Sequence, residues 1–248
     1  MKIPEKGWPM LNQDRVLVHQ IRHQGSVGSM LIKSSVIVFV LSCLFACAPS
    51  LYSVNLKYES STAVIPAAGP GQKLIITVAL FNDTRPGGED LRIGKVTTDM
   101  GGLSTIIPKN LKPAAAVSVI VKDILVKSGY QVSVVMPGWN LHEDAIQKEW
   151  GRILVGGNIE ALEITCQNDI PIKTYQTRAK LSFVFADVQN GKIFYRVTTE
   201  SINTLEHIYF SEEMLGQQIS TTLSEAAEKA FEGNSLKEKI REVLKQTP

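Results

Sequence analysis

The chain has 248 residues, 44% of them hydrophobic, and its 26 basic and 24 acidic residues give a formal charge of +2. This length suits one ordinary globular domain with additional segments. The positive charge is concentrated at the N-terminal end, because residues 1–46 hold five bases and two acids whereas residues 47–248 hold 21 and 22. The near-neutral body lacks the electrostatic footprint of nucleic-acid binding, and we expect no nucleic-acid partner.

A signal-peptide pattern occupies residues 30–47. Lys33 precedes two serines and a short apolar run that begins at Val36. The run is too short to span a bilayer comfortably, which takes about 20 apolar residues, so the pattern favours an export signal. Residues 1–29 are polar and show no useful periodicity. We therefore expect translation to start at Met30; the alternative is a long basic region that still permits export.

The apolar run ends in a short motif that resembles the lipobox of bacterial lipoproteins. Its four residues are Leu44, Phe45, Ala46 and Cys47. Phe45 is bulkier than the usual residue at its position, whereas the small Ala46 lets a peptidase approach. Two or three acyl chains on Cys47 form an effectively permanent anchor, since each buried methylene contributes about 0.8 kcal/mol. The alternative is an uncleaved N-terminal anchor in which Cys47 has no role.

We divide the chain into three parts. Residues 1–46 are predicted to be an N-terminal extension plus the lipoprotein signal peptide. Residues 47–72 are rich in Ser, Pro, Ala and Gly, which predicts a flexible linker after the lipidated cysteine. Residues 73–248 are predicted to form a single α+β periplasmic domain that ends in helices.

The elements of this domain follow from hydrophobic periodicity, caps and turn residues. Strands are expected at 73–81, 92–97, 103–107, 130–136, 153–165, 174–188 and 192–205. Helices are expected at 113–128, 142–150, 212–231 and 235–246. Gly129 ends the first helix, Ser211 caps the third, and Asn190-Gly191 joins the last two strands as a hairpin. This order predicts an α+β fold whose helices cover one face of a mostly antiparallel sheet.

The ordered set of motifs over residues 74–231 resembles the YajG-like family of bacterial envelope lipoproteins. The matching pieces are Asp83-Thr84-Arg85, Gly94-Lys95-Val96-Thr97, the stretch 125–132, Asn190-Gly191-Lys192 and the helix 215–231. The resemblance implies an envelope lipoprotein of α+β fold without established catalytic residues. The layout also looks like the auxiliary lipoproteins of lipid-trafficking ABC transporters. Family knowledge adds that Ala48, in place of an Asp after the lipidated cysteine, favours the outer membrane.

Chemistry-bearing residues are few in the predicted domain. Asp83 and Arg85 are a possible ligand or partner contact at a strand end; alternatively, Asp83 caps the turn and Arg85 pairs with a carboxylate. His142 lacks a second ligand pair at helical spacing, so we expect no metal site. Cys166 has no partner for a disulfide once Cys47 is acylated, and it is expected to be a small buried residue. Gly156-Gly157 predicts a bulge or a close backbone approach.

The sequence thus predicts a lipid-anchored, non-catalytic binding or assembly domain. Its membrane contact is made through acyl chains, such as palmitate, on Cys47, and its partner is an envelope protein. We expect no cofactor, and a position on the outer membrane facing the periplasm. Two alternatives stay open: a subunit of a lipid-trafficking ABC transport system, and an envelope hydrolase that uses Cys166 or His142.

Overall fold

The computed structural model describes residues 50–59, 75–87, 91–98, 100–135 and 138–245, all within the unit Pro49–Pro248. The predicted signal peptide, the expected start at Met30 and the lipobox-like motif with Cys47 lie outside the described residues. In the described ranges, no helix combines the length and apolar character needed to cross a membrane.

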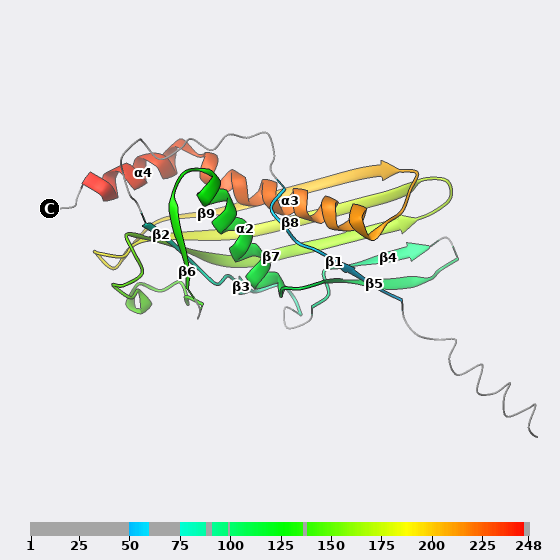
Figure 1. The fold of residues 1–248 in the computed structure, drawn as a ribbon, viewed down its shortest axis with the longest axis horizontal. Helices are drawn as coiled ribbons and strands as arrows, with labels where there is room; N and C mark the ends of the chain where they lie inside the picture. The colour runs from blue at the N-terminus through cyan, green and yellow to red at the C-terminus, as the bar shows by residue number, and fades with distance from the viewer. Residues whose placement is uncertain (1–49, 60–74, 88–90, 99, 136–137, 246–248) are drawn as a thin grey trace, which may run out of the picture. The chain divides into compact units, whose positions relative to one another are not determined.

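The described strands form one sheet organised around the long strand β7 (Ile153–Asn168), as Figure 1 shows. On one side of β7, β8 (Lys173–Asp187) runs antiparallel along its whole length, and β9 (Lys192–His207) pairs in the same way with β8. The other side of β7 is shared by three short parallel strands: β2 (Ile75–Ala79), β3 (Asn82–Asp83) and β4 (Gly94–Thr98). The β7 strand is therefore the common support of the sheet.

Three more short strands complete the sheet beyond these neighbours. They are β6 (Gln131–Val135) beside β2, β5 (Leu103–Pro108) beside β4, and β1 (Leu51–Val54) beside β5. The pairs β1–β5 and β2–β6 are parallel, whereas β4–β5 is antiparallel. The sheet is mixed, so the prediction of a mostly antiparallel sheet is wrong, although the fold is α+β. Periodicity indicates which side chains are buried, but it does not indicate which strands are neighbours.

Three helices cover one face of the sheet: α2 (Pro113–Lys127), α3 (Glu212–Glu232) and α4 (Asn234–Lys245). The predicted ends of the first two are confirmed. Gly129 adopts φ +84°, and the N–H groups of Gly129 and Tyr130 donate to the carbonyl oxygens of Val126 and Leu125, which is the hydrogen-bond pattern of a Schellman motif. The Ser211 hydroxyl accepts the N–H of Met214 at 3.1 Å.

The main core lies between these helices and the sheet. Its centre is a group of phenylalanines in edge contact: Phe183 lies 5.4 Å from Phe81 and 5.8 Å from Phe231 between ring centroids. Gly157 permits this packing, because a Cβ there would meet the carbonyl oxygen of Ser182 at 1.9 Å and the Phe81 ring at 2.6 Å. The prediction of a close backbone approach at Gly156-Gly157 is confirmed at Gly157.

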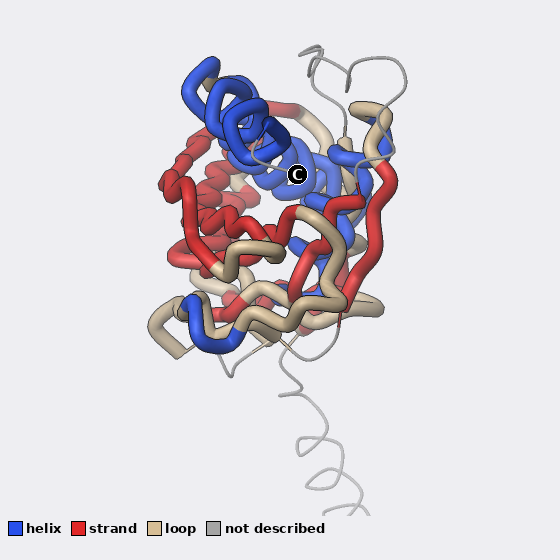
Figure 2. Tube along the Cα trace, turned by 90° about the vertical axis from the view of Figure 1, so that its left-hand side faces the viewer, coloured by secondary structure: helices blue, strands red, loops and turns tan. Residues whose placement is uncertain are grey.

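A smaller apolar cluster lies on the opposite face, around Trp139, Trp150 and Leu154. The segment 138–152 covers it, and Figure 2 shows its short turn η1 (Glu143–Ala145) on the side of the sheet away from the helices. The predicted helix at 142–150 is wrong beyond this turn. The Trp139 indole donates to the carbonyl oxygen of His142 at 2.8 Å, and burial of the two tryptophans fixes the chain in a non-helical path.

The predicted flexible linker 47–72 is also wrong for residues 50–59. These residues include β1 and then run along α3. The N–H groups of Lys57 and Glu59 donate to the hydroxyls of Ser220 and Ser224, and the Tyr58 hydroxyl donates to Glu228 at 2.5 Å. The partners come from a helix far away in the sequence, so local composition gave no sign of this ordered segment. Residues 60–72 lie outside the residues that the structure describes.

Candidate binding groove

The part of the sheet surface without helices or the 138–152 segment is polar, and we call it the helix-free face. Strand alternation puts Glu163 of β7, Arg178 of β8 and Glu200 of β9 on it side by side. Arg178 Nε donates to Glu200 at 2.6 Å, and its Nη1 lies 3.5 Å from Glu163. The hydrogen bond and negative charge of Glu200 raise the pKa of the Arg178 guanidinium, which therefore stays charged. A second pair joins Lys180 to Glu160 at 2.8 Å.

A groove of about 580 Å³ opens on this face. It lies between the loop after β3 and strands β4, β5, β7 and β8. Its volume falls within the range of about 300–1,000 Å³ that is typical of ligand sites. Basic, acidic and apolar side chains line the groove. The basic ones are Arg92, Lys95 and Arg178, the acidic ones are Glu160 and Glu163, and the apolar ones include Pro86 and Leu103. The groove thus offers both charged and apolar contacts to a ligand.

The groove is bordered by the Asp83–Arg85 pair that the sequence singled out. The Arg85 guanidinium donates two hydrogen bonds to the Asp83 carboxylate, from Nε to Oδ1 at 2.8 Å and from Nη2 to Oδ2 at 2.7 Å. Its Nη1 donates to the carbonyl oxygens of Arg92 and Leu162. The structure brings the two residues together, and the carboxylate that Arg85 pairs with is Asp83 itself. The pair holds the loop against β7, so it shapes the groove and has few donors left for a ligand.

Cys166 lies on the opposite, helix-covered face. Its exposed fraction is 1%, and burial raises the pKa of the thiol to about 11, with Tyr175, Lys173 and Asp169 as the neighbouring groups that act on it. A thiol of this pKa is almost entirely protonated at neutral pH, which makes it a poor nucleophile. The prediction that Cys166 is a small buried residue is confirmed.

Two histidines lie in the described residues. His142 lies in the 138–152 segment, where its backbone carbonyl binds Trp139. The ring Nδ1 of His207, the last residue of β9, accepts the Tyr209 N–H at 3.1 Å. In the parts of the chain that the structure describes, no group of three His, Cys, Asp or Glu side chains is arranged to hold a metal ion.

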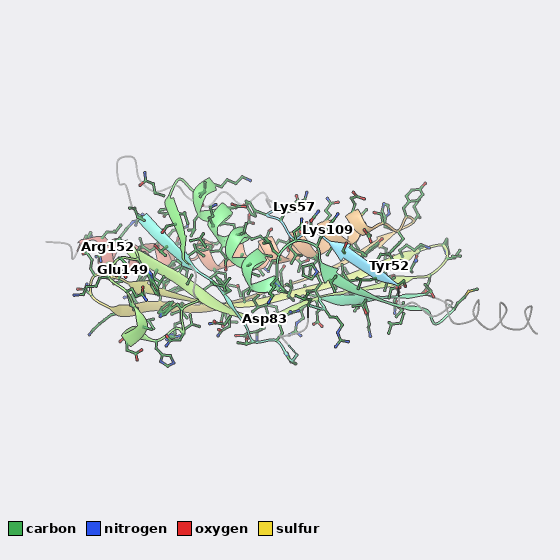
Figure 3. The ribbon with its side chains drawn as sticks, turned by 60° about the horizontal axis from the view of Figure 1, so that its bottom comes forward. Tyr52, Lys57, Asp83, Lys109, Glu149 and Arg152 are labelled. Carbon is green, nitrogen blue, oxygen red and sulfur yellow. The ribbon has the colours of Figure 1, made fainter. Side chains whose placement is uncertain are left out.

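Sequence reasoning missed a second arginine–aspartate pair. Arg152 Nη1 donates to Asp187 and its Nη2 donates to the carbonyl oxygen of Val243 in α4. Asp187 also accepts the N–H groups of Gln189 and Asn190, so it caps the β8–β9 hairpin. Figure 3 shows Asp83 near the middle of the strands and Arg152 near one end of them. The Asp before the hairpin is a weak signal for the cap, but nothing in the sequence links Arg152 to α4.

Comparison with known proteins gives distant matches among solved structures. No family model and no curated protein matches the chain, so the resemblance to the YajG-like family stays a prediction. Among solved structures, a Xanthomonas campestris protein of the DUF330 family is 8% identical with a TM-score of 0.42, covering 73% of this chain and 90% of that one.

Two further solved structures are comparably distant. A putative neuraminyllactose-binding hemagglutinin homolog from Helicobacter pylori is 11% identical with a TM-score of 0.42. The match covers 78% of this chain and 100% of that one. Lipoprotein GNA1162 from Neisseria meningitidis is 12% identical with a TM-score of 0.35, covering 62% of this chain and 99% of that one.

Proposed function

We propose that this protein is an envelope lipoprotein, acylated on Cys47, whose periplasmic domain binds a partner protein through the groove on the helix-free face. The observation that carries the binding role is the groove itself, an open site of about 580 Å³ on a sheet face that helices leave uncovered. Charged side chains at its walls fix the register of a ligand, while Leu103 and Pro86 provide apolar contact.

A non-catalytic role agrees with the chemistry of the titratable groups. The most distinctive nucleophile, Cys166, is buried on the face opposite the groove, and its pKa of about 11 keeps it protonated. Three charged residues of the groove form cross-strand pairs: Arg178 with Glu163 and Glu200, and Glu160 with Lys180. Such exposed pairs contribute little to stability, about 0–1 kcal/mol each, so exchanging them for pairs with a partner costs little.

The anchor is tested first. Growth with a clickable fatty acid should label the wild-type protein and should leave Cys47→Ser unlabelled. Cys43→Ser is the matched control, because it changes the other leader cysteine and should keep the label. Equal labelling of the wild type and Cys47→Ser would refute acylation at Cys47.

The groove is tested by site-specific photocross-linking in the native membrane. A photoreactive amino acid at Lys95 in the groove should give one discrete adduct, and the double variant with Arg178→Glu should lose it. The same probe at Lys192, far along the sheet, is the control and should give no such adduct. If the adduct persists with Arg178→Glu, or appears from both positions, the groove is not the binding site. Loss of the envelope phenotype in a folded Cys166→Ala or His142→Ala variant would overturn the non-catalytic role.

A further inference from the structure

One end of the sheet gathers the termini of several strands that are far apart in sequence. The last residue of β4, Thr98, pairs with the last of β7, Asn168, which in turn pairs with Lys173 at the start of β8. Lys173 pairs with His207 at the end of β9. The first residue of β1, Leu51, pairs with Thr105 near the start of β5. Three connections and the beginning of β1 therefore meet at this end, which lies on the right in Figure 1.

The connections at this end expose large apolar side chains, and we call these residues the tip. They are Leu51, Met100, Ile170, Ile172, Ile208 and Tyr209. Met100 is 92% exposed, Ile170 81% and Tyr209 70%, which are the three highest values among the large apolar side chains described. Single exposed apolar residues need no explanation, but their gathering at one end of a sheet marks a contact surface.

The backbone under the tip is held by hydrogen bonds, so the apolar side chains point outward from fixed turns. The β4–β5 turn is closed by the Thr98 N–H on Gly102 at 3.0 Å and by the Gly101 N–H on Thr98 at 2.9 Å. The carbonyl oxygen of Tyr209 accepts the hydroxyl of the buried Tyr175 at 3.1 Å. These fixed turns present the tip without the entropy loss that ordering a flexible loop would require.

Chain length identifies the surface that the tip meets. Leu51 opens the first described strand and lies only four residues after Cys47. Four fully extended residues reach at most about 14 Å. On the proposed function, on which this step rests, Cys47 carries acyl chains and lies at the membrane. We infer that the tip contacts the lipid surface itself, with Ile170 and Tyr209 in the headgroup region, where Tyr is a favoured residue.

The charges at the tip make this contact apolar rather than electrostatic. Near the exposed side chains, the described segments carry Asp169 and Glu206 against Lys173, and Glu212 and Glu213 share a pocket with Lys57 and Lys109. A surface without net positive charge gains nothing from anionic lipid, unlike a polybasic segment. The tip should therefore enter zwitterionic phosphatidylethanolamine vesicles at least as deeply as vesicles that also contain phosphatidylglycerol.

The experiment places a nitroxide label on the acylated, full mature protein in phosphatidylethanolamine-rich vesicles. Labels are attached in separate variants at Ile170→Cys and Tyr209→Cys, with Gln189→Cys at the opposite hairpin as the matched control. Native Cys166 does not compete, because it is buried. The two tip labels should collide more with oxygen than with a water-soluble nickel chelate, and the control label should show the reverse.

The possible outcomes separate this inference from the proposed function. The protein mass is measured first, and a mass without acyl chains would refute both. Acylated protein whose tip labels behave like the Gln189→Cys control would refute only the lipid contact. Tip labels shielded from both reagents would assign the tip to a second copy of the chain, and that result also overturns the inference.

Discussion

The helix-covered face of the sheet and the helix-free face, which excludes the part under the 138–152 segment, are built in opposite ways. The face beneath α2, α3 and α4 is filled with apolar side chains, and residues such as Ile153, Phe183 and Leu181 are fully buried there. The helix-free face has the same strands but carries ion pairs such as Arg178–Glu200. Packing of apolar side chains determines the helix-covered face, and charged side chains determine the character of the helix-free face. The stability of the domain should therefore depend on the helix-covered face, and recognition of a partner on the helix-free face.

The largest expected effect comes from the centre of the apolar face. Phe183→Ala removes a fully buried ring that contacts Phe81, Phe185 and Phe231. The loss of transfer energy and the resulting cavity should lower the free energy of unfolding by about 3–5 kcal/mol. Urea titration followed by circular dichroism measures the change. The matched control is Gln176→Ala, an exposed position on the same strand, which should change stability by no more than about 0.5 kcal/mol. Similar losses for both variants would remove the distinction between the faces.

A polar contact beneath α3 refines the comparison. The Thr222 hydroxyl lies 2.5 Å from that of Thr177 and accepts a bond from Asn203 Nδ2 at 3.0 Å. Thr222→Val keeps the shape but leaves Asn203 without this acceptor, so a loss of about 1–3 kcal/mol is expected. Thr222→Ser, which keeps the hydroxyl, should recover most of it in the same titration. A neutral Thr222→Val would show that volume alone specifies the helix-covered face.

The buried thiol predicts a pH dependence for the same face. Burial raises the pKa of Cys166 in the folded state to about 11, above its unfolded value of about 8.5. The contribution of the thiol is therefore complete below about pH 8.5 and is lost as the pH rises toward about 11. Stability of the wild type should fall between about pH 8 and pH 10 more steeply than that of Cys166→Ala. Equal slopes for the two proteins would indicate a thiol that water reaches.

The smallest effect on stability is expected on the helix-free face. Arg178→Ala removes exposed pairs with Glu163 and Glu200, so the free energy of unfolding should change by less than about 1 kcal/mol. The same variant should weaken the photocross-link from the groove at least severalfold. Gln176→Ala, on the neighbouring exposed position, should leave that cross-link intact. A large loss of stability with no loss of cross-linking would reverse the roles assigned to the two faces.

Local features of this fold were predictable from sequence, and long-range ones were not. The caps at Ser211 and Gly129 depend on residues within a few positions of each helix end, and both were found. The partners of Arg85 at Arg92 and Leu162, and of Arg152 at Asp187, are set by strand register. The alternation of apolar residues along a strand does not determine this register, because a strand buries the same residues whether its neighbours are parallel or antiparallel.

The binding groove likewise combines residues that were predictable from the sequence with residues that were not. Asp83 and Arg85 stood out because two opposite charges lie two residues apart after a strand, and they pair as local geometry allows. The groove also needs Lys95, Glu163 and Arg178, which three different strands supply. Each is an ordinary surface residue in its own strand, so only the assembled sheet distinguishes it.

The contact between residues 55–59 and α3 has a consequence for folding during synthesis. The Ser220 hydroxyl donates to the carbonyl oxygen of Asn55 across a sequence separation of 165 residues. A chain made from its N-terminus presents residues 55–59 long before α3 arrives. The segment 55–59 can thus complete its packing only after almost the whole chain has been made. Until then β1 lacks its helix, and a chaperone has its longest opportunity to bind at this end of the domain.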